Sequence, residues 1–139
     1  MKKVAGIIII SFLLISSVFA QKDSKANEVK PIDISWIDGT WRGIGYQIDG
    51  ATWDVLFTKD EKGELSISYP TLSCVGVWKI VSTEENRIVL KEEITTVGST
   101  CDQGTIVILN KVTPKHIAVS YFLPTDQERV IAYSTLTKQ

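Results

Sequence analysis

TWRGIGYQIDGATWDVLFT, residues 40–58, is the stretch of sequence that predicts the fold. Its two halves, 40–48 and 51–58, are rich in β-branched and aromatic residues, which favour strands. Between them stands Asp49-Gly50, a dipeptide typical of a two-residue hairpin turn, because that turn needs positive φ angles. The stretch therefore predicts two antiparallel strands joined by a tight turn.

The same pattern continues along the rest of the chain. Short runs rich in strand-forming residues recur between turn residues, and they predict six further strands: 64–69, 74–82, 87–94, 104–110, 116–122 and 129–137. Pro70 ends the first of these, because proline cannot donate to a sheet ladder. From residue 40 onward, no stretch has the 3.6-residue period of a long amphipathic helix.

The number and spacing of these strands decide the fold class. Eight short strands with short connections predict an all-β domain, an eight-stranded antiparallel up-and-down barrel. Closure of the barrel removes the exposed sheet edges that otherwise invite aggregation. A two-sheet β-sandwich is the alternative.

The two cysteines of the chain fit the barrel. Cys74 begins the fourth predicted strand, and Cys101 follows the fifth, whose end lies near the start of the fourth in an antiparallel meander. We therefore expect a Cys74–Cys101 disulfide at one end of the barrel. Two cysteines and the single His116 are too few for the four ligands of a structural zinc site. No metal and no cofactor are expected.

The N-terminus is typical of an exported protein. Residues 1–20 combine a basic start, an apolar run over 7–15 and small or apolar residues at 18–20, which is the pattern of a cleaved secretory signal peptide. The run is shorter than the ~20 apolar residues of a membrane span, and no cysteine follows it to accept a lipid. We expect cleavage near Ala20-Gln21, no stable membrane anchor afterwards, and a periplasmic or secreted protein, in which a disulfide is favoured.

The mature chain is expected to have a leader and one domain. Residues 21–35 are polar and contain no aromatic side chain. They predict a flexible leader before a domain over 36–139. Removing residues 1–20 removes two lysines and no acids, which leaves 13 basic and 16 acidic residues and a net charge of −3. This balance gives no basic footprint for nucleic acid or for an anionic membrane surface.

Catalytic motifs are not found in the sequence. It has no nucleophile elbow, no phosphate-binding glycine loop and no histidine pair. His116 begins a predicted strand and is interpreted as an exposed residue rather than a general base. Acids for a glycosidase-type pair are available, but Glu92 and Glu93 are adjacent on a strand and point to opposite faces. We expect a protein that is not an enzyme.

Two groups of residues resemble known families. Gly39-Thr40-Trp41 resembles the G-x-W start of lipocalin-like and avidin-like barrels. A longer pattern over residues 39–122 resembles a family of small bacterial extracytoplasmic β domains: Trp41-x-Gly43, Gln47, Tyr69-Pro70-x-Leu72-x-Cys74-x-Gly76, Glu92-x-Ile94-Thr95, Gly98, Cys101 and Gly104. That resemblance implies the fold and the compartment and brings no assigned activity. Gly43 stands where biotin-binding barrels supply a polar side chain, so biotin binding is not expected.

The fifth predicted strand places a carboxylate on an apolar face. Ile88, Leu90, Glu92 and Ile94 alternate on the side expected to face inward. Glu92 then either meets a polar or cationic group of a ligand, or is a structural carboxylate satisfied by Arg42, a tyrosine or loop amides. The candidate ligand-binding residues are Trp41, Trp53, Tyr69, Trp78 and Glu92, with Tyr121 as a further aromatic. The alternative is that these aromatic residues only fill the core.

The sequence allows two orientations of the first strand, which differ in the side chains that point into the barrel. If Trp41 points inward, so do Gly43, Gly45 and Gln47, which leaves an apolar outer face made of Arg42, Ile44, Tyr46 and Ile48. If the order is reversed, or a bulge intervenes, Ile44 and Tyr46 join the core. In either case the two glycines indicate that some group approaches the backbone closely.

Together these features predict a secreted, non-catalytic binding module that holds a small apolar or amphipathic ligand in its barrel. The alternative is a module that binds an extracytoplasmic protein, as an envelope scaffold or an inhibitor of a hydrolase. Such a module would use the outer face of the first strand or the loop 96–104.

Overall fold

Eight strands and two short 3-10 helices make up the part of the chain that the computed structural model describes, residues 31–139. In chain order they are η1 (Ser35–Ile37), β1 (Gly39–Gln47), β2 (Thr52–Lys59), β3 (Leu65–Tyr69), η2 (Pro70–Leu72), β4 (Cys74–Glu84), β5 (Arg87–Ile94), β6 (Ile106–Thr113), β7 (His116–Leu123) and β8 (Asp126–Lys138). All eight predicted strands are present, with ends that differ by at most three residues from those predicted. The expected signal peptide and residues 21–30 of the expected leader lie outside the described residues.

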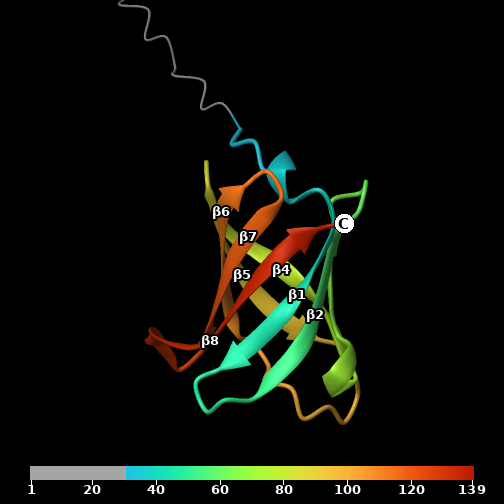
Figure 1. Ribbon diagram of the computed structural model, residues 1–139, viewed down its shortest axis with the longest axis vertical. Coiled ribbons are helices and arrows are strands. Elements are labelled where there is room, and N and C mark those ends of the chain that lie inside the picture. Colours follow the sequence, from blue (N-terminus) through green and yellow to red (C-terminus); the bar gives the residue numbers. More distant parts are fainter. Residues whose placement is uncertain (1–30) are drawn as a thin grey trace, which may run out of the picture. The chain divides into compact units, whose positions relative to one another are not determined.

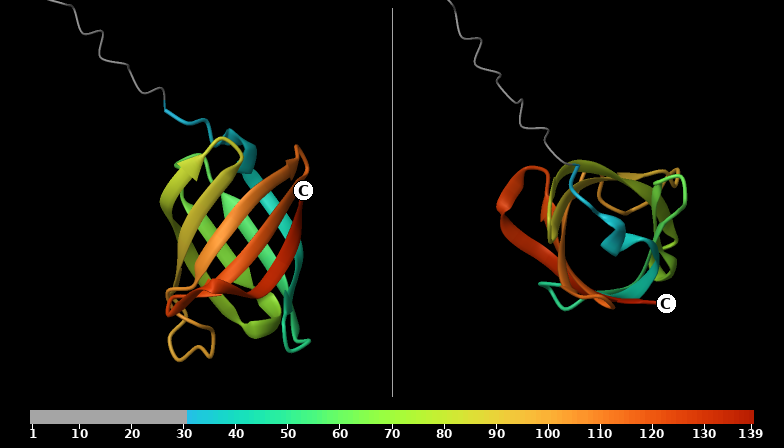
Figure 2. Two further views of the ribbon diagram at one scale, coloured as in Figure 1. Left: turned by 90° about the vertical axis from the view of Figure 1, so that its left-hand side faces the viewer. Right: turned by 90° about the horizontal axis from the view of Figure 1, so that it is seen from above.

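The strands form a closed antiparallel barrel in which each strand pairs with the next along the chain (Figures 1 and 2). The ring is closed by β1 and β8, whose register runs from Trp41 opposite Lys138 to Gln47 opposite Ala132. The prediction of an eight-stranded up-and-down barrel is confirmed, and the sandwich alternative is wrong. Because the ring is closed, none of the eight strands presents a free edge.

The first hairpin has a different turn from the one predicted. The Gln47 N–H donates to the Ala51 carbonyl (2.8 Å) and the Gly50 N–H donates to the Gln47 carbonyl (2.9 Å), so three residues connect the strands. Gly50 has a φ of 94°, but Asp49 is not among the described residues with positive φ, as a two-residue type I′ turn would require. Asp49 instead accepts the Ala51 N–H through Oδ1 at 3.0 Å. The hairpin is confirmed, and the two-residue turn is wrong.

The facing of β1 is settled by burial. Trp41 is fully buried in the barrel, whereas Ile44 is 45% and Tyr46 42% exposed, so the tryptophan and the glycines point inward. The other strands alternate in the same sense, and on β5 the residues Ile88, Leu90, Glu92 and Ile94 are buried, as predicted. The interior is filled by apolar side chains from every strand, among them Trp41, Trp78, Phe57, Ile88, Leu90 and Leu109.

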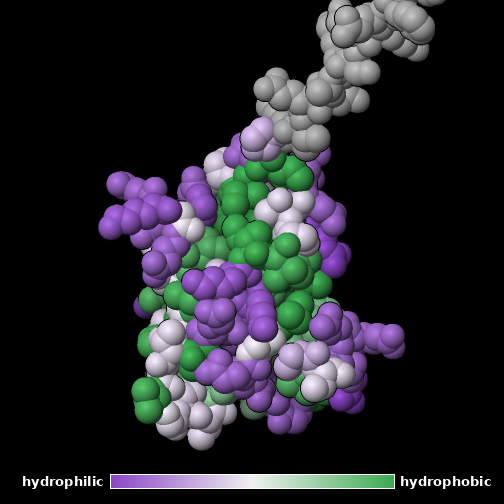
Figure 3. Space-filling view, turned by 180° about the vertical axis from the view of Figure 1, so that it is seen from behind, coloured by the Kyte–Doolittle hydropathy of each residue, from purple (hydrophilic) through white to green (hydrophobic). Residues whose placement is uncertain are grey.

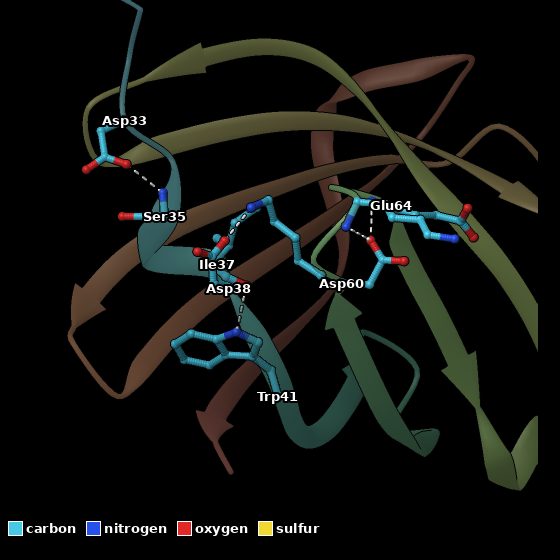
Figure 4. A network of polar contacts seen from close by, with 9 residues as sticks. Asp33, Ser35, Ile37, Asp38, Trp41, Asp60 and Glu64 are labelled. Atoms are coloured by element: carbon cyan, nitrogen blue, oxygen red, sulfur yellow. Dashed lines mark hydrogen bonds and ion pairs between the residues drawn. The ribbon is translucent and has the colours of Figure 1, made fainter.

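One end of the barrel is sealed by the chain that enters it. Figure 2, seen from above, shows η1 lying across this end. Ile37 at the end of η1 is fully buried, and its carbonyl accepts the indole N–H of Trp41 at 3.0 Å (Figure 4). Asp33 accepts the backbone N–H of Ser35 at 2.8 Å, and Ile34 packs against the core. The segment that packs on the barrel therefore begins before residue 36, within the range predicted as leader.

Candidate functional site

The barrel interior is hollow at the end away from η1. A cavity of about 240 Å3 lies there, between the ends of β1, β3, β5 and β7, the start of β2, the η2 turn, the β5–β6 loop and β8. This is the lower end in Figure 1, where the long β5–β6 loop lies. Its wall consists of Gln47, Trp53, Tyr69, Leu72, Glu92, Thr100, Cys101, Asp102, Thr105, Tyr121, Ile131 and Ala132. The middle of the barrel is packed, so a ligand site in this barrel is confined to one end.

Three aromatic rings from different strands form one side of the cavity. The ring of Trp53 on β2 meets the ring of Tyr69 edge to face, with centroids 6.4 Å apart and planes at 88°. It meets the ring of Tyr121 on β7 in the same way, at 6.1 Å and 68°. This is a favourable arrangement of aromatic quadrupoles, and it fixes the rings with respect to one another.

The position of the Trp53 indole depends on a glycine. Gly45 on β1 is the cross-strand partner of Trp53. A Cβ atom built on Gly45 would lie 2.3 Å from Cε2 of the indole, well inside van der Waals contact. The indole therefore lies directly on the β1 backbone, and only a residue without a side chain leaves room for it. The close approach expected at the β1 glycines is confirmed here.

Glu92 is a buried carboxyl group at the inner end of the cavity. It is only 4% exposed, and its Oε2 atom accepts hydrogen bonds from the Trp78 indole N–H at 2.8 Å and from the Tyr69 hydroxyl. Burial raises the pKa of Glu92, because desolvation disfavours its charged form; the two hydrogen bonds act in the opposite direction. Oε1 accepts no hydrogen bond from the described residues, and Glu92 is part of the cavity wall.

Tyr121 provides a hydroxyl group that is not well satisfied. The residue is 3% exposed, and its hydroxyl lies beside that of Tyr69, but it makes no hydrogen bond of good geometry within residues 31–139. Burial raises the pKa of Tyr121, and also that of Tyr69, so both hydroxyls are neutral at physiological pH. Most buried polar groups in proteins are hydrogen-bonded, and one that is not costs stability. An unsatisfied hydroxyl in a cavity wall is therefore a place where a ligand can supply the missing partner.

The loop between β5 and β6 is tied to the barrel at the mouth of the cavity. Cys101 forms the predicted disulfide with Cys74 at the start of β4, with Cα atoms 6.6 Å apart. The side chain of Gln103 makes two hydrogen bonds with the backbone of Ile94. It accepts the Ile94 N–H at 3.0 Å and donates to the Ile94 carbonyl at 2.7 Å. Gly104, with a φ of 73°, turns the chain so that its N–H donates to the Glu92 carbonyl at 3.1 Å. These ties place Asp102 in the cavity wall near Glu92.

The predicted ligand-binding residues divide into two groups. Trp53, Tyr69 and Glu92 line the cavity, as does the further aromatic Tyr121. Trp41 lies at the sealed end, where the Lys138 ammonium stands 5.4 Å above its ring, and it is not in the cavity wall. Trp78 is not in the wall either: it stacks on Phe57 and holds Glu92.

The structure differs from the sequence-based prediction in the partners of Glu92 and in some residues of the cavity wall. Arg42, considered as a partner for Glu92, lies exposed on the outer face of β1, and the partners of Glu92 are Tyr69 and Trp78. Asp102, Ile131 and Ala132 were not singled out, although the loop that carries Asp102 was. Ile131 and Ala132 have no signal in the sequence, because their place in the wall depends on how β8 closes the ring.

The outer surface of the barrel carries exposed apolar residues. Tyr46 on β1 and Tyr133 on β8 are cross-strand partners whose rings stack with centroids 5.5 Å apart, and Tyr133 is 56% exposed. The apolar outer face considered for the first strand is thus present, with Ile44 beside this stack. On the opposite side, where β4 and β5 lie, apolar side chains also gather, among them Ile80 and Val81 at a β-bulge in β4 (Figure 3).

Among residues 31–139, no group of three or more His, Cys, Asp or Glu side chains is arranged to hold a metal ion. No helix in this part of the chain is long and apolar enough to cross a membrane. His116 is exposed at the start of β7, with Nδ1 2.9 Å from the Thr113 hydroxyl, and is absent from the cavity wall.

Comparisons with known proteins support the fold. No protein-family profile and no curated protein matches the sequence. Two solved structures are similar in fold: a redesigned beta barrel, b11L5F_LGL, and EF1p2_mFAP2b bound to DFHBI. The first has a TM-score of 0.54 and 16% identity, and the match covers 76% of this chain and 93% of that chain. The second has a TM-score of 0.52 and 12% identity, with 76% and 95% covered. At these identities the likeness shows a small β-barrel, and the family pattern of the sequence stays a prediction.

Proposed function

We propose that this protein is a non-catalytic, extracytoplasmic binding module that holds a small amphipathic ligand at the open end of its barrel. One observation carries the proposal: the cavity between Trp53 and Tyr121 contains a buried hydroxyl that the described residues leave unsatisfied. Apolar walls with a few convergent polar groups are typical of small-molecule sites. The ligand would cover the aromatic rings and supply a hydrogen-bond partner to Tyr121.

The size of the cavity limits the ligand. At about 240 Å3 it falls just below the range of roughly 300–1,000 Å3 typical of drug-sized ligands. A cavity of about 150 Å3 in another protein is enough to bind benzene. The proposed ligand is therefore about one ring with a short substituent, rather than a lipid or a tetrapyrrole.

Two further facts support the proposal. The structural neighbour EF1p2_mFAP2b is bound to DFHBI, so a barrel of similar fold holds a small molecule. The Cys74–Cys101 disulfide is consistent with an oxidising compartment outside the cytoplasm, where the predicted signal peptide would send the chain.

Native mass spectrometry of the protein purified from its own host tests the proposal. The expected result is a retained small molecule, and its loss in Ala132→Leu, because Ala132 lies in the cavity wall and a larger side chain would fill the space. Ala118→Leu is the matched control, since Ala118 points away from the interior on β7. An unoccupied wild type that also fails to bind added one-ring compounds would refute the proposal, as would ligand retention unaffected by Ala132→Leu.

A second candidate function is an interaction module for an extracytoplasmic protein, as an envelope scaffold or a hydrolase inhibitor. The exposed stack of Tyr46 and Tyr133 favours it, because tyrosine is enriched in interfaces. A copy of this chain is the partner that can be tested with pure protein. Sedimentation velocity over a concentration series would show dimers that Tyr46→Ser disrupts; a monomer at every concentration would count against this partner.

A further inference from the structure

The charges around the cavity are of one sign. Two carboxyl groups lie in its wall, Glu92 at the inner end and Asp102 on the loop at the mouth, and none of the lysine, arginine or histidine residues within 31–139 lies there. The two acids line the same cavity, and the charge of Asp102 makes a small contribution to raising the pKa of Glu92. In a site with low-dielectric walls, such charges favour a cation over a neutral molecule or an anion.

The hydrogen bonding of Glu92 leaves one oxygen available. Tyr69 and Trp78 both donate to Oε2, and they hold the carboxyl group in a fixed orientation. Oε1 has no donor among the described residues. A buried carboxylate is costly unless it is paired with a charge or with hydrogen-bond donors. A charged donor bound in the cavity would supply the hydrogen bond that Oε1 lacks.

The aromatic residues suit the same kind of ligand. The ring of Trp53 stands at a steep angle to the rings of both Tyr69 and Tyr121, so the aromatic part of the cavity wall is not flat. Aromatic faces attract ammonium groups, and tryptophan does so most strongly. The Tyr121 hydroxyl is buried and makes no hydrogen bond of good geometry to the described residues, so it adds an acceptor for an ammonium N–H.

We infer that the ligand of this cavity is a small organic amine, bound as the ammonium ion by Glu92 with its apolar body against the aromatic rings. This inference rests on the proposed function and specifies the chemical class of its ligand. Asp102 at the mouth would attract the cation and contribute less to its binding, because it is exposed and its charge is screened.

Three compounds of one skeleton separate charge from shape: phenethylamine, 2-phenylethanol and phenylacetate. We expect the amine to bind the wild-type protein at least tenfold more tightly than the alcohol, and the carboxylate to bind most weakly, as measured by calorimetry and by the change in tryptophan fluorescence. Equal or tighter binding of the alcohol or the carboxylate would overturn the inference and leave the proposed function standing. No binding of any of the three would count against both.

Variants then identify the group that selects the charge. Glu92→Gln keeps an acceptor for Tyr69 and Trp78 but removes the negative charge, so the amine is expected to lose its tenfold advantage while the alcohol binds as before. Asp102→Asn, on an exposed loop residue, is expected to reduce amine affinity by a smaller factor without affecting folding. Glu93→Gln on the outer face of β5 is the control of equal charge change and is expected to have no effect. An amine preference that survives Glu92→Gln would overturn the assignment.

Discussion

Trp78 and Glu92 face each other directly across β4 and β5, and the indole N–H of Trp78 donates to the carboxyl group at 2.8 Å. A core tryptophan thus positions an acid inside the barrel. The Tyr69 hydroxyl bonds to the same oxygen, so the carboxyl group is fixed from two strands. The protonation of Glu92 is therefore expected to affect the free energy of unfolding as well as ligand binding.

Glu92→Gln is expected to remove a pH dependence of stability. The pKa of Glu92 is raised in the folded state, mainly by burial and in part by Asp102, above its ordinary value of 4.5, which applies in the unfolded chain. Between these two values the folded protein retains a proton that the unfolded chain has lost. The free energy of unfolding therefore falls as pH rises through this range, by about 1.4 kcal/mol for each pKa unit. Tyr69 and Tyr121, the other titratable groups facing Glu92, stay neutral there.

Urea unfolding between pH 4 and pH 8 measures this effect. The free energy of wild type should fall relative to that of Glu92→Gln as pH rises. Glu93→Gln, which is exposed on the same strand, should retain the wild-type pH dependence. Parallel curves for wild type and Glu92→Gln would contradict the assignment.

Tyr121→Phe is expected to stabilise the ligand-free protein by about 1 kcal/mol. The hydroxyl is buried without a hydrogen bond of good geometry, and removing it relieves a desolvation cost of this order. The same change should weaken ligand binding, so that stability and affinity move in opposite directions. Thermal unfolding with and without phenethylamine measures both quantities. Tyr46→Phe, at an exposed tyrosine, should change neither, and a destabilised Tyr121→Phe would show that the hydroxyl has a partner.

Reduction of the Cys74–Cys101 disulfide is expected to lower the free energy of unfolding by about 3–4 kcal/mol. The bond joins residues 27 apart, and its loss frees the unfolded chain. It should also weaken ligand binding, because Cys101 and the neighbouring Asp102 lie in the cavity wall. Calorimetric unfolding with and without a reductant measures the first effect, and the Cys74→Ser, Cys101→Ser double variant should be insensitive to reductant. An unchanged melting temperature would contradict a stabilising role.

Gly45→Ala is expected to destabilise the protein by about 1–3 kcal/mol, as overpacking of a core does. The added methyl group would overlap the Trp53 indole, which would have to leave its place on β1. In a Trp53→Leu background the same substitution should cost much less, because the smaller side chain can move aside. Chemical unfolding of the four proteins gives the coupling energy. Equal costs in the two backgrounds would show that the indole does not depend on Gly45.

The fold was predictable because several local signals agree. Alternating apolar residues, as at Ile88, Leu90 and Ile94, set which face of a strand points inward, and Gly63 and Pro70 mark ends of strands. The disulfide followed from the order of the strands. The turn at Asp49-Gly50 was mistaken, because the same dipeptide suits a three-residue loop with glycine in the left-handed position.

The site was predictable only in part, because it depends on depth along the barrel axis. The alternation of apolar and polar residues along each strand shows that Trp41, Trp53 and Trp78 point inward. It does not show which of them lies in the packed part of the interior and which lies beside the cavity. Trp41 meets Ile37 of η1, whereas Trp53 lies on Gly45 next to open space. The wall residue Ala132 depends on the pairing of β8 with β1, which joins the two ends of the domain.

Ile37 and Trp41 close one end of the barrel, so the interior is open to solvent at the other end. A molecule held at the other end has no second exit, so its arrival and its departure use the same opening, bordered by the disulfide-tethered loop. The rates at which a ligand binds and dissociates would then depend on the position of this loop. The covalent bond that stabilises the fold would in this way also affect the exchange of the ligand.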